Sequence, residues 1–256
     1  MGNIYKFSYD NKDDAIRSLA NYYSISVDTL NYKIIDVYNY IENLKSKGSY
    51  SEYSANGMML VNIRYLLNPN LCELENSKIQ ISFYHRCASD GKDTWFKDGL
   101  LNSVDGIECF MKKLGSLVPD IEKMGISLES LKRIIRKKGL DEEQSEKDGI
   151  NGFYRLKDAR DKDNSGFDLP EVFNDLLRGE SYQKLKAKIL TVLKPTVVKF
   201  YVERDIAELN NILDHYWELV LNDDGVGQTG ANVGRGKTIP YENIERIDYL
   251  EKVSNA

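Results

Sequence analysis

The chain has 256 residues, a length that suits one large domain or one medium domain with a small attachment, and it can bury a substantial core. Its composition, with 41% hydrophobic and 29% charged residues, is that of an ordinary globular protein, and its net charge of −5 excludes a basic field over the whole chain for nucleic acid. Three cysteines without metal-ligand spacing and the lack of a long apolar segment indicate a soluble protein of the cytoplasm with no membrane partner.

The first 75 residues predict a helical N-terminal module. Apolar residues at helical spacing indicate one helix capped by Asp13 or Asp14 and a second helix from Leu30 to Leu44 that ends at Gly48. The turn between them is similar to that of a helix-turn-helix unit, so DNA binding is one interpretation. The other is a plain packing or partner module, because the second helix offers few basic side chains and the module is rich in tyrosine, which suits a protein surface.

The next segment predicts a strand. Residues 48–57 indicate a loop, and after a short apolar element Ile79, Ile81 and Phe83 alternate with polar residues, the pattern of a half-buried strand. We expect this strand to end at His85, before a polar segment. His85 is then either a functional side chain where a strand opens into a loop, or a histidine whose ring is satisfied by backbone at a sheet edge.

Helices dominate the middle of the chain. Apolar spacing predicts helices over residues 104–114 and 128–135, the second capped by Ser127, and another helix starting near Pro170. The basic run 132–138 is either a local patch for nucleic acid or the solvated face of a helix.

Three strands are predicted late in the chain, over residues 196–202, 216–221 and 244–250. Strands that cluster late among helices favour an α+β fold over repeating βαβ units. Glu218 interrupts the second of these strands. Because an unpaired buried carboxylate is unfavourable, Glu218 either meets partners or a ligand, or points to solvent.

Two polar loops imitate known binding loops without completing them. Residues 161–166 resemble the first half of a calcium loop, but Val172 stands where a bidentate glutamate is needed, so a surface loop is favoured. Residues 225–236 are rich in glycine but lack the spacing of a phosphate-binding loop, which favours a flexible connection between two strands.

Five short segments occur in a characteristic order. They are Phe83–Cys87 (FYHRC), Lys97–Leu101 (KDGLL), Asn151–Tyr154 (NGFY), Trp217–Val220 (WELV) and Thr238–Ile244 (TIPYENI). In this order they resemble the His-Tyr-Glu type of the ADP-ribosyltransferase superfamily. In that family a histidine strand precedes a Gly-Leu turn, a later strand opens with a Gly-Phe-Tyr-like segment, and a glutamate strand precedes an Ile-Pro segment. The resemblance covers roughly residues 78–250.

The resemblance implies a fold and a cofactor. Residues 76–256 would form an ADP-ribosyltransferase-like split β-sheet core that follows the helical module of residues 1–75 and binds NAD, the substrate, between two small sheets. Catalytic roles would fall to Glu218, His85 and Tyr154, and the contacts with NAD to His85, Arg86, Phe153 and Tyr154. No metal is expected.

Each catalytic residue has an implied role. His85 would hydrogen-bond the adenosine-side ribose, and Tyr154, or in its place Phe153 or Tyr201, would stack on the nicotinamide. Glu218 would engage the other ribose and stabilise the oxocarbenium-like charge as nicotinamide leaves. Family members commonly have Gly-Thr or Arg-Thr after the histidine, whereas Arg86 and Cys87 follow it here.

The predicted function is that of a mono-ADP-ribosyltransferase-like enzyme, as in toxins and in host-attack or defence factors. Its macromolecular acceptor is left open by the sequence, and the helical module would recognise a target, a protein partner or an inhibitor. The alternative is a non-enzymatic nucleic-acid- or protein-binding regulator with a helix-turn-helix-like N-terminal unit.

Overall fold

A computed structural model describes residues 4–55, 57–70, 78–119, 121–141, 149–161, 169–205, 209–222 and 230–251. The chain divides into two compact units, each made of two segments: unit 1 is Met1–Ser82 with Glu203–Gln228, and unit 2 is Phe83–Val202 with Thr229–Ala256. The N-terminal helices therefore share a unit with a segment from the last quarter of the sequence.

Six strands form one hydrogen-bonded sheet in the order β5-β3-β2-β4-β6, with β1 parallel to the first residues of β2. Strand β3 is antiparallel to β2, β5 to β3, and β6 to β4. The bounds are β1 Ile4–Phe7, β2 Lys78–Ser89, β3 Asn151–Phe153, β4 Lys194–Asp205, β5 Gly230–Asn232 and β6 Ile244–Tyr249.

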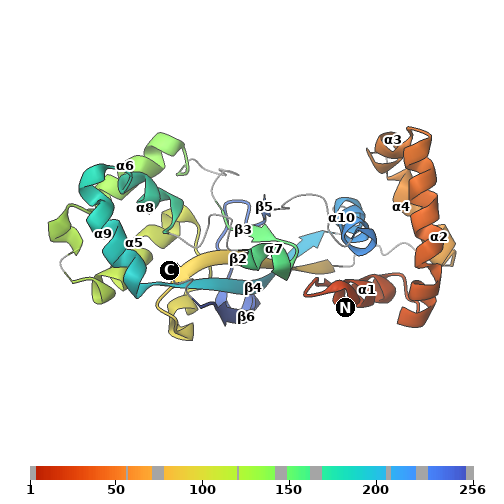
Figure 1. The fold of residues 1–256 in the computed structure, drawn as a ribbon, viewed down its shortest axis with the longest axis horizontal. Helices are drawn as coiled ribbons and strands as arrows, with labels where there is room; N and C mark the ends of the chain where they lie inside the picture. The colour runs from red at the N-terminus through yellow and green to blue at the C-terminus, as the bar shows by residue number, and fades with distance from the viewer. Residues whose placement is uncertain are drawn as a thin grey trace. The chain divides into compact units, whose positions relative to one another are not determined.

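The helices of unit 1 include both helices predicted near the N-terminus. The cap of the first is Asn11, whose side chain accepts from the backbone N–H of Asp14, and the cap of the second is Ser26. Within residues 48–57, predicted as a loop, Tyr50–Ala55 form a helix. The bounds are α1 Lys12–Tyr22, α2 Val27–Ser46, α3 Tyr50–Ala55, α4 Met58–Leu67 and α10 Leu209–Leu221 (Figure 1).

A strained residue joins α1 to α2. Ser24 has a φ of 53°, in the left-handed region that glycine occupies at little cost. In this turn a serine therefore adopts the backbone conformation that is usually adopted by glycine in helix-turn-helix units. Whether the two helices bind DNA or a protein stays a prediction.

Helix α10 is buried in the core of unit 1. The Trp217 indole donates from Nε1 to the Tyr23 hydroxyl at 3.1 Å, and the Tyr9 hydroxyl donates to the Leu219 carbonyl at 3.0 Å. The rings of Phe7 and Tyr216 pack edge to face with centroids 5.3 Å apart. The N-terminal segments thus complete the core around a helix far along the chain.

The prediction of a strand over residues 216–221 is wrong, because these residues belong to α10. A short apolar run fits a buried strand or a buried helix equally well. The helical period becomes visible only when the window starts earlier. The buried residues of α10 are Ile212, Leu213, Tyr216, Trp217, Leu219 and Val220.

Most helices of unit 2 pack around one apolar cluster that includes Leu114, Leu131, Phe173 and Ile189 (Figure 1). The predicted Ser127 cap is confirmed, since its side chain accepts from the backbone N–H of Ser130. The bounds are α5 Ser103–Leu117, α6 Leu128–Lys138, α7 Leu156–Arg160, α8 Glu171–Leu176 and α9 Gln183–Val192, with single 3₁₀ turns at η1 Asp93–Phe96, η2 Ile121–Met124, η3 Glu180–Tyr182 and η5 Tyr241–Asn243.

The basic run 132–138 lies on α6, and Lys132, Arg136 and Lys138 form ion pairs within unit 2. Lys132 pairs with Glu108 at 2.7 Å, and Lys138 pairs with Glu171 and Asp175. Three of the bases fall in the last turn, where cations complement the helix dipole. This favours the solvated helix face over a patch for nucleic acid.

Strand β2 differs from its prediction in length and burial. It continues four residues past His85 to Ser89, and its polar residues Gln80 and Ser82 are buried like the apolar residues between them. Both faces of this part of β2 are buried. Strand β2 is central in the sheet, between β3 and β4 in the strand order, and β1 pairs with its first residues. His85 is therefore at neither a strand end nor a sheet edge.

The described chain mixes helices and strands and is compatible with the predicted α+β class. Strands β4 and β6 confirm two of the three late strands. No helix in the described ranges is long and apolar enough to cross a membrane. Residues 162–168 of the calcium-like loop and 223–229 of the glycine-rich loop lie outside the described residues.

Candidate functional site

The pairing of β2 with β3 decides which predicted site residues lie together in unit 2. Tyr84 is the partner of Phe153 across the two strands. Because side chains alternate along a strand, Phe83 and His85 point to the other face, where the Tyr154 ring packs on Phe83 with centroids 4.8 Å apart. We call this side of the sheet, on which Phe83 is buried and His85 and Tyr154 are half-buried, the His85 face.

The His85 imidazole is half-buried and bound to backbone. Its Nδ1 lies 2.8 Å from the carbonyl oxygen of Asn151 on β3. The ring is thus satisfied by backbone, as one of the two interpretations of His85 expected, but inside the sheet and not at its edge. Burial lowers the pKa of His85 below its ordinary 6.5, and the bond to Asn151 acts against this. A neutral ring that donates from Nδ1 leaves Nε2 as a hydrogen-bond acceptor, suited to a hydroxyl group.

Arg86 and Phe153 lie on the opposite face of the sheet. The buried Arg86 side chain donates from Nε to the Ala159 carbonyl at 2.9 Å, donates to the Asp158 carbonyl as well, and lies over the Phe153 ring at 4.3 Å. Arg86 thus anchors α7 to the sheet. Neither residue can touch a ligand bound on the His85 face, so the four implied NAD contacts do not share one surface.

Tyr201, the alternative to Tyr154, stands on β4. Alternation places it with Lys199, whose ammonium lies over the ring of Tyr84, and therefore on the Arg86 side of the sheet. Among the three candidates for a stacking ring, Tyr154 alone lies on the His85 face.

Two other segments of the family pattern meet in unit 2. The Leu100 N–H donates to the Ile239 carbonyl at 2.9 Å, and the Ile239 N–H returns a bond to Leu100 at 2.8 Å. Gly99 has a φ of +83°, and a Cβ there would lie 2.1 Å from the Ile239 carbonyl oxygen. The Gly-Leu turn and the Ile-Pro segment are therefore bound together, and glycine is required at the junction.

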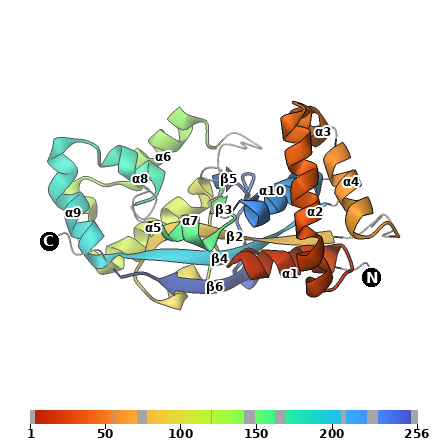
Figure 2. The same ribbon diagram turned by 45° about the vertical axis from the view of Figure 1, so that its right-hand side comes forward.

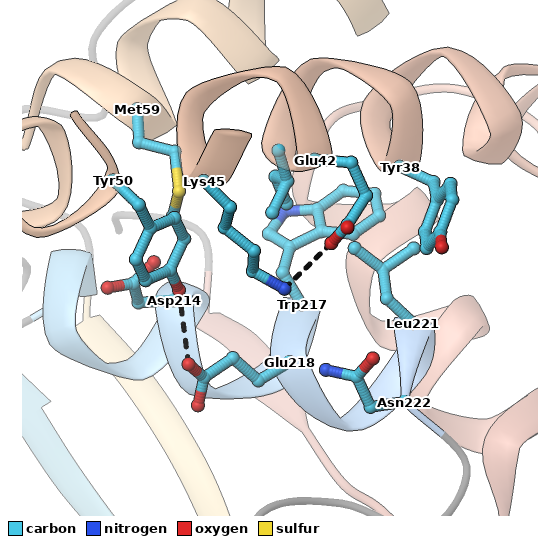
Figure 3. Close-up of a pocket in the computed structure, with 11 residues that line it drawn as sticks. Tyr38, Glu42, Lys45, Tyr50, Met59, Asp214, Trp217, Glu218, Leu221 and Asn222 are labelled. Carbon is cyan, nitrogen blue, oxygen red and sulfur yellow. Dashed lines mark hydrogen bonds and ion pairs between the residues drawn. The ribbon is translucent and has the colours of Figure 1, made fainter. Parts of the chain in front are cut away.

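Glu218 lines a small pocket of unit 1. Figure 3 shows the Tyr50 hydroxyl directed at the Glu218 carboxylate, to which it donates at 3.1 Å. One turn away, the Ser54 hydroxyl donates to Asp214. The residues of this Glu218 pocket are Tyr38, Ile41, Glu42, Lys45, Tyr50, Met59, Asp214, Trp217, Glu218, Leu221 and Asn222.

The electrostatics of the Glu218 pocket combine three carboxylates with one ammonium. Lys45 Nζ pairs with Glu42 at 2.8 Å and lies 5.6 Å from the centroid of the Tyr50 ring. Burial, followed by the charges of Glu218 and Asp214, raises the pKa of Tyr50, so this phenol stays protonated and donates. Burial also raises the pKa of Asp214, against the effect of the Ser54 bond, and its Oδ1 is buried without a hydrogen-bond partner.

The size of the Glu218 pocket limits its ligands. Its volume of about 10 Å³ has room for roughly one water molecule. A dinucleotide does not fit there. In the described part of the chain, no three His, Cys, Asp or Glu side chains gather closely enough to hold a metal ion.

The predicted site residues are thus distributed over different environments. His85 and Tyr154 lie together in unit 2, Arg86 and Phe153 lie behind them, and Glu218 belongs to a helix of unit 1. Sequence reasoning missed Tyr50, Ser54 and Asp214. The sequence signal for these residues is weak: Tyr50 and Ser54 are four residues apart, and so are Asp214 and Glu218. This spacing places each pair on one side of its helix, but it does not indicate that the two helices pair across more than 150 residues.

Comparison with protein-family models, with curated proteins and with solved structures found no match. The family resemblance therefore rests on the five segments and on the contacts that they make.

Proposed function

We propose that unit 2 is an ADP-ribosyltransferase-like domain that binds NAD on the His85 face. The observation that carries this proposal is the pairing of β2 with β3, by which His85 and Tyr154 lie on the same side of the sheet, with Tyr154 packed on Phe83. The bridge between Leu100 and Ile239 adds support, because it joins two further segments of the same family pattern.

The chemistry of the face suits a nucleotide with ribose and an aromatic base. Nε2 of His85 is placed to accept a hydrogen bond from a ribose hydroxyl. Tyr154 supplies a ring for stacking, held in place by Phe83. Gly152 permits this close packing, since a Cβ there would lie 2.9 Å from the Cβ of Phe83.

Glu218 is not assigned a catalytic role in this proposal. The resemblance calls for a carboxylate on the strand before the Ile-Pro segment, but Glu218 lies on a helix and is held by Tyr50. The strand at that place in the chain is β5, which consists of Gly230, Ala231 and Asn232. We therefore propose NAD binding without efficient cleavage, because the stabilisation of the developing cation needs a positioned anion.

Calorimetric titration of the full chain with NAD tests the proposal. Tyr154→Ala should weaken NAD binding by about tenfold or more through loss of the stacking surface, and His85→Ala should weaken it by several-fold. Glu218→Gln is the matched control and should bind NAD like wild type. Heat of binding that is absent in wild type, or unchanged in Tyr154→Ala, would overturn the assignment.

A nicotinamide-release assay, with and without cell lysate, separates binding from catalysis. We expect no release above the uncatalysed rate. Release by wild type that Glu218→Gln abolishes would restore Glu218 as the catalytic carboxylate and the chain as a mono-ADP-ribosyltransferase. The predicted cytoplasmic location, and a role in host attack or defence, stay predictions.

The second candidate, a non-enzymatic regulator, is favoured by one observation in unit 1. Lys33, one of the few basic residues of the second predicted helix, donates to the carbonyls of Leu66 and Leu67 at 2.7 and 3.1 Å. This use of Lys33 disfavours contact with phosphate and favours protein binding by the helices.

A further inference from the structure

The outer face of α2 exposes large apolar side chains. Tyr32 is 82% exposed, Ile35 56% and Tyr38 40%, whereas the opposite side of the same helix is buried in unit 1. Of the tyrosines that suggested a protein surface, Tyr23 is buried and Tyr40 accepts a bond from Asn62. The outer face of α2 is formed by Asp28, Tyr32, Ile35, Asp36, Tyr38 and Glu42.

This face is negatively charged. Asp28 and Asp36 are exposed, and within the described ranges neither forms an ion pair. Helix α4 packs beside α2 (Figure 2). The bases of α2 do not neutralise Asp28 and Asp36, since Lys33 donates to carbonyls of α4 and Lys45 pairs with Glu42. An apolar stripe flanked by unpaired carboxylates is complementary to a surface that is both apolar and basic.

The stripe leads into the Glu218 pocket. Tyr38 and Glu42 belong to both, and Figure 3 shows them at one side of the pocket with Lys45 directed inward. Asp214 and Glu218 accept bonds from hydroxyls, but among the described residues neither has a cationic partner. The position of Lys45 over the Tyr50 ring shows that the pocket accommodates an ammonium group.

We propose that the outer face of α2 binds a basic amphipathic segment of a partner protein. Aliphatic side chains of that segment would cover Tyr32, Ile35 and Tyr38, and its Lys or Arg side chains would meet Asp28 and Asp36. Burial of exposed aromatic rings supplies affinity, and the opposite charges supply orientation and specificity. Nucleic acids and anionic membranes carry the wrong charge for this face.

The test uses two synthetic 18-residue helical peptides with the same leucine stripe, one with lysine and the other with glutamate at the remaining positions. Fluorescence anisotropy with the full chain should show the lysine peptide binding at least about tenfold more tightly. Ile35→Asp should weaken that binding by about tenfold or more. Val61→Asp, on the 42% exposed Val61 of α4, is the matched control and should leave it unchanged.

Charge reversal tests specificity. The double variant Asp28→Lys, Asp36→Lys should reverse the preference, so that the glutamate peptide binds more tightly. Equal binding of both peptides, insensitivity to Ile35→Asp, or binding of single-stranded DNA or phosphatidylserine vesicles that Ile35→Asp abolishes would each overturn the proposal. Circular dichroism verifies the fold of each variant. NAD titration of the same variants keeps this test separate from the proposed function, because α2 and the His85 face belong to different units.

Discussion

The Tyr50 hydroxyl and the Glu218 carboxylate are joined by a hydrogen bond of 3.1 Å, and the bond from Ser54 to Asp214 repeats the arrangement one helical turn away. In each helix the two partners are four residues apart, so both lie on the same side of their helix. Helix α3 has only six residues and is too short to be stable by itself. These two bonds hold α3 against α10, so Glu218 has a structural role.

Loss of the Tyr50 hydroxyl should therefore destabilise the protein. We expect Tyr50→Phe to lower the free energy of unfolding by about 1 kcal/mol, and Glu218→Gln, which keeps an acceptor oxygen, to lower it by less. Urea unfolding measures both, and the double variant should show less than the sum of the two effects. Tyr53→Phe, on the same helix, should be close to neutral; equal effects of Tyr50→Phe and Tyr53→Phe would contradict the role of the bond.

Asp214 should make stability depend on pH. Because burial raises its pKa in the folded state above the ordinary 3.8, its contribution to stability is fully present below that value and is lost as the pH rises through the folded pKa. Asp214→Asn keeps an acceptor for Ser54 and cannot ionise. We expect the variant to be more stable than wild type at pH 7, with the difference shrinking towards pH 4 in urea titrations. A variant less stable than wild type at pH 7 would show that the charge of Asp214 is compensated.

Gly99 should tolerate no side chain. Its φ is positive, and a Cβ at this position would lie only 2.1 Å from the Ile239 carbonyl oxygen, so we expect Gly99→Ala to cost about 3 kcal/mol of stability. The matched control is Gly115→Ala in α5, where nothing lies within 4 Å and alanine should stabilise the helix by about 0.5 to 1 kcal/mol. Thermal unfolding of the two variants should shift in opposite directions, and a neutral Gly99→Ala would exclude this account of the junction.

At Ser24 we expect a change to glycine to stabilise the protein. Ser24→Gly removes the cost of a left-handed non-glycine residue and should raise stability by up to about 1 kcal/mol. Ser24→Ala keeps that cost and should stay close to wild type. Chemical denaturation distinguishes the two, and destabilisation by Ser24→Gly would contradict the assignment of strain to this residue.

Local sequence patterns predicted the elements whose burial is one-sided. Helix α6 was identified by its apolar spacing and its Ser127 cap, because one face is buried and the other solvated. Patterns were less informative where burial is nearly complete. Alternation predicted the strand β2 but not its burial, because polar Gln80 and Ser82 are buried and Gln80 donates to Glu203 at 3.2 Å. The buried run 216–221 was wrongly predicted as a strand, since it belongs to α10.

The candidate site was predictable only in its local part. His85 and Tyr154 were named because the segments around them carry the family pattern, and strand pairing brings them together. The setting of Glu218 depends on Tyr50, which is 168 residues away in the chain. No periodicity within either helix specifies that pairing, since it arises only when the two segments pack.

Because unit 1 is made of two segments that are far apart in the chain, its core can form only late in synthesis. Helices α1 to α4 cannot complete their core until α10 has been translated, and α10 begins about 140 residues after α4 ends. At about 5 to 20 residues per second, the apolar sides of the nascent N-terminal helices stay uncovered for roughly 7 to 30 s. During that interval they are a target for chaperones, and truncated chains that end before residue 209 should remain so permanently.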